Sequence, residues 1–230
     1  MDPIIWVEEI DSRDKARIEE VVKNLSNMTP DYSGGFSDIY VVGDYAIKRT
    51  FYNHVDDTID HPDADLDTEG YPIECILQSD KYLLSQMRGH NNFPVLYGYT
   101  GDLEPENDCV HEDVVIMDFL KGPSLDDLLM HNTRDQKNNI LSRLEKPIKK
   151  VLADIIYAGW YPVDFRFRCV YPHEKDGFKL IDYNLYQSIE YMKMNDSVID
   201  FSDPKKLANK VWECVVDYEL CRAVPLFWAG

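Results

Sequence analysis

The chain has 230 residues, 44% of them hydrophobic, enough for one large domain or two small lobes around a core. Its 24 basic and 42 acidic residues give a net charge of −18, which argues against nucleic acid as a partner and would attract a basic protein. Five cysteines without CxxC spacing, no basic segment before an apolar run and no long apolar stretch indicate a reduced, cytoplasmic protein without membrane contact.

The first expected elements are a helix and a hairpin. Asp11 or Ser12 can cap a helix whose apolar residues recur at helical spacing. Two strands, 38–42 and 45–50, are rich in β-branched and aromatic residues, and the tight turn Gly43-Asp44 separates them. These patterns predict a packing helix followed by a β-hairpin.

A second glycine turn precedes this hairpin, in the stretch Ser33-Gly-Gly-Phe-Ser-Asp-Ile-Tyr40. Glycines let backbone N–H groups approach phosphate oxygens, and Lys48, one strand later, can add a positive charge near the phosphates. The same pattern also suits an ordinary hairpin. A phosphate role for this segment therefore depends on the residues that follow.

The middle of the chain continues the β-rich half. Residues 53–69 are strongly acidic and predict a solvated loop, and residues 73–87 carry an apolar stripe at helical spacing. Strands are expected at 93–99 and 114–120, the second of them a buried apolar run. Together with the hairpin, these segments predict a mainly antiparallel sheet with one helix.

The chain then becomes α-rich. Ser124 or Asp126 can start a short helix, and a long helix is expected over 134–158, with Gly159 as its C-terminal stop. Pro147 lies inside this helix and predicts a kink or a break. Ser202-Asp203-Pro204 provides the N-cap and first residue of a last helix. Its predicted buried face consists of Leu207, Val211, Val215 and Tyr218.

Two acidic residues flank a predicted hairpin that follows the long helix. Asp164 lies on a loop, and Asp182 ends the apolar strand Phe178-Lys-Leu-Ile181. In phosphoryl-transfer sites, one such carboxylate orients a hydroxyl nucleophile and the other binds the magnesium that bridges nucleotide phosphates. The spacing therefore makes both residues candidates for a phosphotransferase site.

The order of these segments resembles the protein kinase-like superfamily over roughly residues 32–186. The glycine turn resembles the family's glycine-rich loop, and Ala46-Ile47-Lys48 its lysine-bearing strand. Val115–Leu120 resembles the gatekeeper and hinge. The resemblance assigns loop roles to Gly34, Gly35 and Phe36, phosphate binding to Lys48, gatekeeper and adenine-facing roles to Met117, Asp118 and Leu120, hydroxyl orientation to Asp164, and magnesium binding to Asp182.

Several positions depart from the family pattern. Tyr32 and Ser37 replace loop glycines, and Cys169, a soft ligand unsuited to magnesium, replaces the asparagine expected after Asp164. Arg166 stands in place of the usual lysine and retains a cation. The acid that would pair with the phosphate lysine falls at Asp80, with Glu74 as the competing choice. About 45 residues follow Asp182, without the family's usual substrate lobe, as in minimal kinases of bacterial effectors and phages.

The resemblance implies an α+β, two-lobed kinase-like fold, with a β-rich N-lobe at about 1–120, a reduced helical C-lobe at about 121–230 and ATP between them. The implied function is magnesium-dependent transfer of the ATP γ-phosphoryl group to serine or threonine hydroxyls of a protein. One alternative is a pseudokinase that binds and sequesters a protein partner, and the net charge of −18 favours a basic partner. The other alternative is a small-molecule phosphotransferase. The expected location is the cytoplasm, and it would be the cytoplasm of a host cell if the chain is an effector or phage protein.

Overall fold

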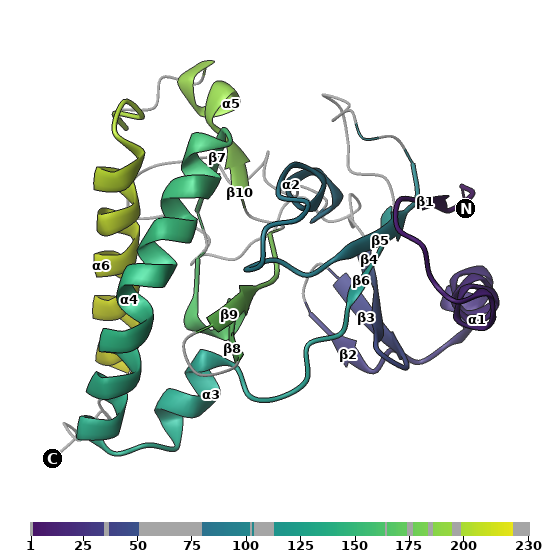
Figure 1. The fold of residues 1–230 in the computed structure, drawn as a ribbon, viewed down its shortest axis with the longest axis horizontal. Helices are drawn as coiled ribbons and strands as arrows, with labels where there is room; N and C mark the ends of the chain where they lie inside the picture. The colour runs from purple at the N-terminus through teal and green to yellow at the C-terminus, as the bar shows by residue number, and fades with distance from the viewer. Residues whose placement is uncertain are drawn as a thin grey trace, which may run out of the picture. The chain divides into compact units, whose positions relative to one another are not determined.

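The structure of the chain is a computed structural model with a mixed α+β fold (Figure 1). It describes residues 2–34, 37–50, 80–101, 103, 113–163, 165–173, 177–183, 186–194 and 199–222. The chain divides into two compact units. The first unit contains Met1–Arg88, Val95–Phe119 and Tyr183–Leu185, and the second contains Gly89–Pro94, Leu120–Asp182 and Tyr186–Gly230.

A six-stranded antiparallel sheet, ordered β1-β5-β6-β4-β3-β2, forms the centre of the first unit. Its strands are β1 (Ile5–Trp6), β2 (Tyr32–Ser33), β3 (Ser37–Val42), β4 (Tyr45–Thr50), β5 (Leu96–Tyr99) and β6 (Asp113–Asp118). The predicted hairpin is confirmed, since β3 pairs with β4 up to Val42 and Tyr45. Gly43 has a φ of 66°, the left-handed conformation that a two-residue hairpin turn requires.

Helix α1 (Ser12–Asn24) packs on one face of this sheet. The helix begins at one of the two predicted caps, because the Asp11 carboxylate accepts the Arg13 N–H at 2.8 Å, and a short 3₁₀ turn (Leu25–Asn27) follows it. The buried cluster beneath it comprises Ile18, Val22, Leu25, Tyr40, Val42, Ile47, Val114 and Ile116. Since side chains alternate along a strand, the neighbours of these strand residues point to the opposite face.

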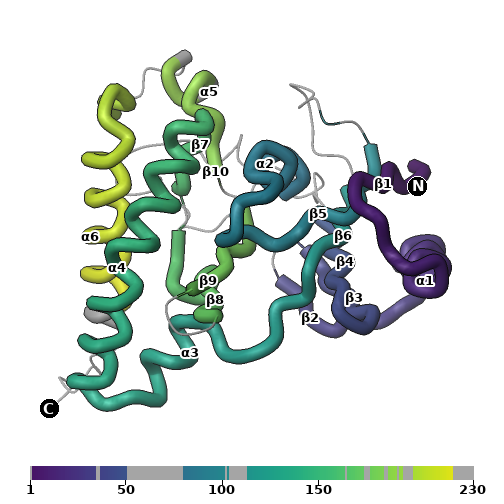
Figure 2. Tube along the Cα trace, viewed as in Figure 1, coloured from purple at the N-terminus to yellow at the C-terminus, as the bar shows by residue number. Residues whose placement is uncertain are grey.

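The described helices of the second unit are α3 (Leu125–Met130), α4 (Arg134–Tyr157), α5 (Ile189–Met194) and α6 (Pro204–Arg222). Helices α4 and α6 lie side by side, and the backbone trace shows the same arrangement (Figure 2). Helix α4 matches the predicted 134–158 segment. Thr133 and Gln136 form a capping box at its start, and Gly159, with a φ of 97°, follows its end.

At Pro147, where the sequence predicts a kink or a break, α4 is not broken and continues with Leu144 and Ile148 buried on either side. The predicted buried face of α6 needs correction at one residue. In α6, Leu207 and Val215 are buried as predicted, but Tyr218 is 44% exposed. The Tyr218 ring lies under the guanidinium of Arg166, whose carbon is 4.4 Å from the ring centroid, so Tyr218 serves a surface contact.

Two small antiparallel sheets complete the described part of the second unit. Strand β7 (Trp160–Pro162) pairs with β10 (Tyr186–Ser188), and the predicted hairpin is confirmed as β8 (Val170–His173) with β9 (Gly177–Leu180). Asn92 fastens the segment 89–94 to this hairpin, since its carbonyl accepts the Leu180 N–H at 2.8 Å. The hairpin therefore holds a distant stretch of chain within the second unit.

Ser124, one of the two predicted starts, is the N-cap of helix α3 and forms a capping box. The Ser124 hydroxyl accepts the Asp127 N–H, and the Asp127 carboxylate accepts the N–H and the hydroxyl of Ser124. These hydrogen bonds lower the pKa of Asp127 from its ordinary value of 3.8. Ionised Asp127 therefore stabilises the folded state above that value, and the contribution is lost as pH falls through the lower folded pKa.

We expect Ser124→Ala to lower the free energy of unfolding by about 1 kcal/mol at neutral pH. The penalty should shrink in acid, because protonated Asp127 no longer accepts both Ser124 hydrogen bonds in the native protein. Urea unfolding of both proteins at neutral pH and below the Asp127 pKa measures this difference. A penalty of equal size at both pH values would contradict the assigned role of Asp127.

None of the described helices combines the length and the apolar content that crossing a bilayer requires. In α4, charged residues recur along the exposed surface, and in α6 they follow the first proline directly. This finding concerns the described residues alone.

Candidate functional site

The candidate site lies on the sheet face opposite α1, and its centre is Lys48. Lys48 is paired with Ile39 on β3 and with Val115 on β6, so the three side chains point to the same face. Ala46 and Met117 form the next cross-strand pair on this face and are both buried. Lys48 therefore lies in a row of apolar side chains and is itself 2% exposed.

Lys48 forms a buried ion pair with Asp80, the first residue of helix α2 (Asp80–Gln86). Its Nζ is 2.7 Å from Asp80 Oδ2, and the two side chains are 3% and 0% exposed. The other carboxylate oxygen, Oδ1, accepts the backbone N–H of Tyr183 at 3.0 Å. Asp80 is thus the described partner of Lys48, whereas Glu74, the alternative from sequence, lies outside the described residues.

The burial of the Lys48–Asp80 pair bears on whether the pair stabilises the fold. Moving two charges out of water is costly, and their mutual attraction offsets this only when geometry and additional hydrogen bonds are good. The Tyr183 N–H supplies such a hydrogen bond to Asp80. Apolar pairs of similar size often stabilise a core equally well, so a buried ion pair is weak evidence for a purely stabilising role.

A second buried lysine, Lys81, was not predicted from the sequence. Its Nζ lies 2.9 Å from the Asp113 carboxylate and 3.1 Å from the carbonyl oxygen of Thr100. The Lys81 side chain is 3% exposed, much like that of Lys48. The first two residues of α2, Asp80 and Lys81, thus each form an ion pair with a residue of the sheet. The only local hint in the sequence is that Asp80 and Lys81 are adjacent charged residues. The polar start of an exposed helix would look the same, so this hint does not predict that Lys81 is buried.

The glycine turn is described in part. Gly34 donates its N–H to the carbonyl oxygen of Ser37 at 2.8 Å, which closes the turn between β2 and β3. A Cβ on Gly34 would lie 3.6 Å from that oxygen, an ordinary contact, so the packing of the turn does not require glycine here. Tyr32 is 57% exposed, with its ring centroid 6.3 Å from that of Phe119. Gly35 and Phe36 lie outside the described residues.

The residues predicted as gatekeeper and hinge lie at the end of β6. Met117 is buried on the Lys48 face. Asp118 has a structural role, because its carboxylate accepts the Val95 N–H at 2.9 Å and the Tyr97 hydroxyl at 3.0 Å. Burial, together with the nearby Asp118 charge, raises the pKa of Tyr97. The Asp118 N–H also bonds to Val95, so this N–H is occupied within the sheet.

The segments that carry Cys169 and Asp182 are hydrogen-bonded to each other in the second unit. The carbonyl oxygen of Cys169 accepts the N–H of Ile181, the residue before Asp182, at 3.0 Å. Cys169 is 3% exposed and ends the 3₁₀ turn Phe167–Cys169. Asp182 has a φ of 66°, and among the described residues it alone has a positive φ without being glycine. Such backbone conformations cluster at functional sites.

The remaining predicted site residues are Arg166, Leu120 and Asp164. Arg166 precedes the 3₁₀ turn and lies over the Tyr218 ring, as described above. Leu120 is half-buried and begins the main segment of the second unit. Its N–H has no hydrogen-bond partner among the described residues. Asp164 lies outside the described residues, so its proposed role is not addressed by the geometry.

The fit of magnesium can be tested on these residues. Magnesium prefers oxygen ligands and usually takes one or two protein carboxylates, with water and phosphate completing its shell. Asp182 offers a carboxylate, whereas Cys169 offers a thiol. Within the described segments, no three His, Cys, Asp or Glu side chains gather into a metal-binding group. The residues therefore fit a single carboxylate ligand at Asp182 but lack an oxygen ligand at position 169.

Comparisons with known proteins show no family for this chain. No protein-family model matches the sequence, and no curated protein matches it. The resemblance of residues 32–186 to the protein kinase-like superfamily therefore stays a prediction that depends on the quoted motifs. The geometry around Lys48 stands independently of that resemblance, because it follows from strand register and hydrogen bonds.

Proposed function

We propose that this chain binds Mg·ATP and transfers the γ-phosphoryl group to a serine or threonine hydroxyl of a protein. The observation that carries the proposal is the buried Lys48–Asp80 pair, whose carboxylate also accepts the N–H of the residue after Asp182. An ammonium group held by a fixed carboxylate is suited to phosphate oxygens. The strained backbone of Asp182 is further support.

In this proposal each residue has one task. Lys48 binds phosphate oxygens, and Asp80 holds its ammonium group in place. Asp182 is the carboxylate ligand for Mg²⁺, which when bound neutralises phosphate charge. Asp164 orients the acceptor hydroxyl, and Arg166 offsets charge on the transferred group.

The adenine ring would lie on the apolar residues beside Lys48. Ile39, Ala46 and Met117 share its face of the sheet, which suits an aromatic ring. Ile39 was not singled out from the sequence, although strand alternation places it on this face. The Leu120 N–H, without a partner among the described residues, is the hinge donor in this proposal.

A second candidate function is nucleotide-dependent binding of a partner without phosphoryl transfer. The specific observation in its favour is Cys169, which is buried and bonded to the segment that carries Asp182. A thiol at this position is a poor substitute for an oxygen ligand to magnesium. This candidate shares the nucleotide site and differs only in the chemical step.

Nucleotide binding is tested by thermal unfolding with and without Mg·ATP. At a ligand concentration of about 100 times Kd, binding should raise the free energy of unfolding by about 2.7 kcal/mol. We expect Lys48→Met to lose most of this increment, because the phosphates lose their cation.

Lys81→Met provides a matched control. It also breaks a buried lysine–aspartate pair of the first unit and should destabilise the protein comparably, but it should keep the Mg·ATP increment. The proposal fails if the unaltered protein shows no increment. It also fails if both lysine variants lose the increment equally.

A further inference from the structure

Helices α4 and α6 carry a net positive charge, whereas the rest of the chain is strongly acidic. The whole protein carries 24 basic and 42 acidic residues. Helices α4 and α6 together hold ten of the basic residues and only six of the acidic ones. The remaining sequence is therefore even more acidic than the net charge of −18 indicates. The two helices thus carry an excess of four positive charges (ten basic minus six acidic residues) in an otherwise acidic chain.

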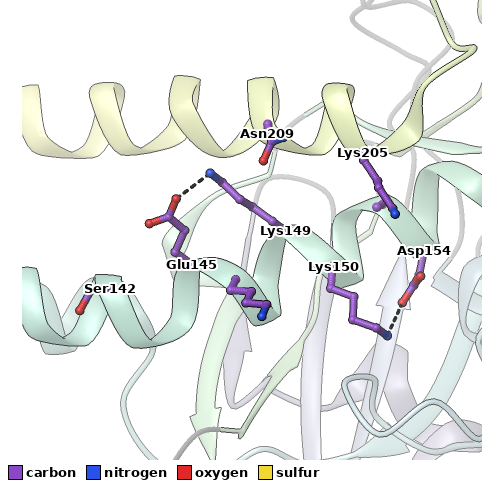
Figure 3. Close-up of a pocket in the computed structure, with 9 residues that line it drawn as sticks. Ser142, Glu145, Lys149, Lys150, Asp154, Lys205 and Asn209 are labelled. Atoms are coloured by element: carbon purple, nitrogen blue, oxygen red, sulfur yellow. Dashed lines mark hydrogen bonds and ion pairs between the residues drawn. The ribbon is translucent and has the colours of Figure 1, made fainter.

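A groove of about 560 Å³ runs between these helices in the second unit (Figure 3). Lys150 and Asp154 of α4 lie near Lys205 of α6, while Glu145 and Lys149 lie near Asn209, so the helices run antiparallel. The lining residues are Ser142, Glu145, Lys146, Lys149, Lys150, Ala153, Asp154, Lys205 and Asn209. The lysine methylenes and Ala153 add apolar surface to this charged groove.

The four lysines of the groove outnumber its two carboxylates. Lys149 pairs with Glu145 at 2.6 Å, and Lys150 pairs with Asp154 at 3.1 Å. Lys146 and Lys205 are exposed and have no ion-pair partner among the described residues. The groove thus keeps two uncompensated positive charges, one on each helix. The positive charges of Lys146 and Lys205 favour a negatively charged ligand.

We infer that the α4–α6 groove binds an acidic, extended segment of a partner protein. From Ser142 to Asp154 the groove spans about 18 Å of helix, at about 1.5 Å per residue. An extended peptide of five or six residues covers that length, at about 3.3 Å per residue. Lys146 and Lys150 are one helical turn apart, about 6 Å, which matches carboxylates on alternate residues of such a peptide.

The charge distribution favours a short peptide over nucleic acid or an anionic membrane. Exposed charges act over a Debye length of about 8 Å at physiological salt, so a short segment in the groove responds mainly to the groove's own lysines. An extended polyanion also meets the acidic remainder of the protein and is repelled. Net charge alone favoured a basic partner, whereas this groove selects an acidic one. The inference does not rest on the proposed phosphotransferase function.

The test uses a fluorescein-labelled (Glu-Ala)₄ peptide and fluorescence anisotropy with the full chain. We expect binding that weakens as salt is raised, and no binding of the uncharged (Gln-Ala)₄ peptide. The double variant Lys146→Glu/Lys205→Glu should weaken binding of the acidic peptide about tenfold or more, because two attractions become repulsions. Circular dichroism and the melting temperature confirm that this variant is folded.

The control double variant is Arg134→Glu/Lys137→Glu, which changes net charge equally on the same helix α4 but outside the groove. It should retain most of the affinity. Equal loss in both double variants would overturn the inference, because attraction would then depend on total charge alone. Tighter binding of oligothymidylate or of phosphatidylserine vesicles than of the peptide would likewise overturn it.

Discussion

Lys48→Met should lower the free energy of unfolding by about 3–5 kcal/mol, one of the two largest effects expected for a single substitution in this chain. The variant removes the cation that lies 2.7 Å from the Asp80 carboxylate, and Asp80 is 0% exposed, so water cannot take the place of that cation. Urea unfolding at neutral pH measures the loss. A loss below about 1 kcal/mol would contradict the buried ion pair.

A double-mutant cycle separates the pair from its surroundings. Lys48→Met/Asp80→Asn removes both charges, and the asparagine oxygen still accepts the Tyr183 N–H. We expect the double variant to be more stable than Lys48→Met alone, because the buried Asp80 charge is removed together with its Lys48 partner. If the two effects simply add, Lys48 and Asp80 do not interact in the folded protein.

Local sequence signals predicted much of the secondary structure. The cap at Asp11, the start of α3 at Ser124, the bounds of α4 and the Gly43 turn each depend on residues close in sequence. The residue choice at these positions reflects hydrogen bonds formed within one turn. Such features need no knowledge of the tertiary structure, and that is why they could be predicted.

The features that sequence missed or mispredicted depend on contacts between distant elements. Lys81 pairs with Asp113, 32 residues away, and no local pattern indicates that a lysine there is buried. Tyr218 fits the helical period of a buried face, yet it is 44% exposed and stacks on Arg166, which is 52 positions earlier in the sequence (218 − 166). The charge of the α4–α6 groove likewise arises from two helices that lie far apart in the sequence.

The candidate site combines both kinds of information. Lys48 and Asp182 were selected by spacing and order, and Asp80 was one of two acids left open as the partner of Lys48. The structure places one of these acids, Asp80, 2.7 Å from Lys48, whereas Glu74 lies outside the described residues. It also shows that the Asp80 carboxylate accepts the N–H of Tyr183, the residue that follows Asp182 in the sequence.

On the proposed function, Asp182→Ala and Asp182→Gly should both reduce phosphoryl transfer at least about 100-fold, since each removes the carboxylate proposed to bind Mg²⁺ and several kcal/mol of charge stabilisation with it. Transfer of label from γ-³²P-ATP into the protein itself is the measurement. The pseudokinase alternative predicts no transfer in the unaltered protein, so a dependence on Asp182 distinguishes the two functions.

The same two variants separate catalysis from backbone strain. Both remove the carboxylate and its contacts, but alanine must hold a φ of 66° with a Cβ, whereas glycine adopts this conformation without steric conflict. Asp182→Ala should therefore be about 1 kcal/mol less stable than Asp182→Gly. A glycine variant that is the more stable of the two yet equally inactive shows that the carboxylate, and not the fold around it, is needed for transfer. If instead the glycine variant retained transfer, Asp182 would have no metal-binding role.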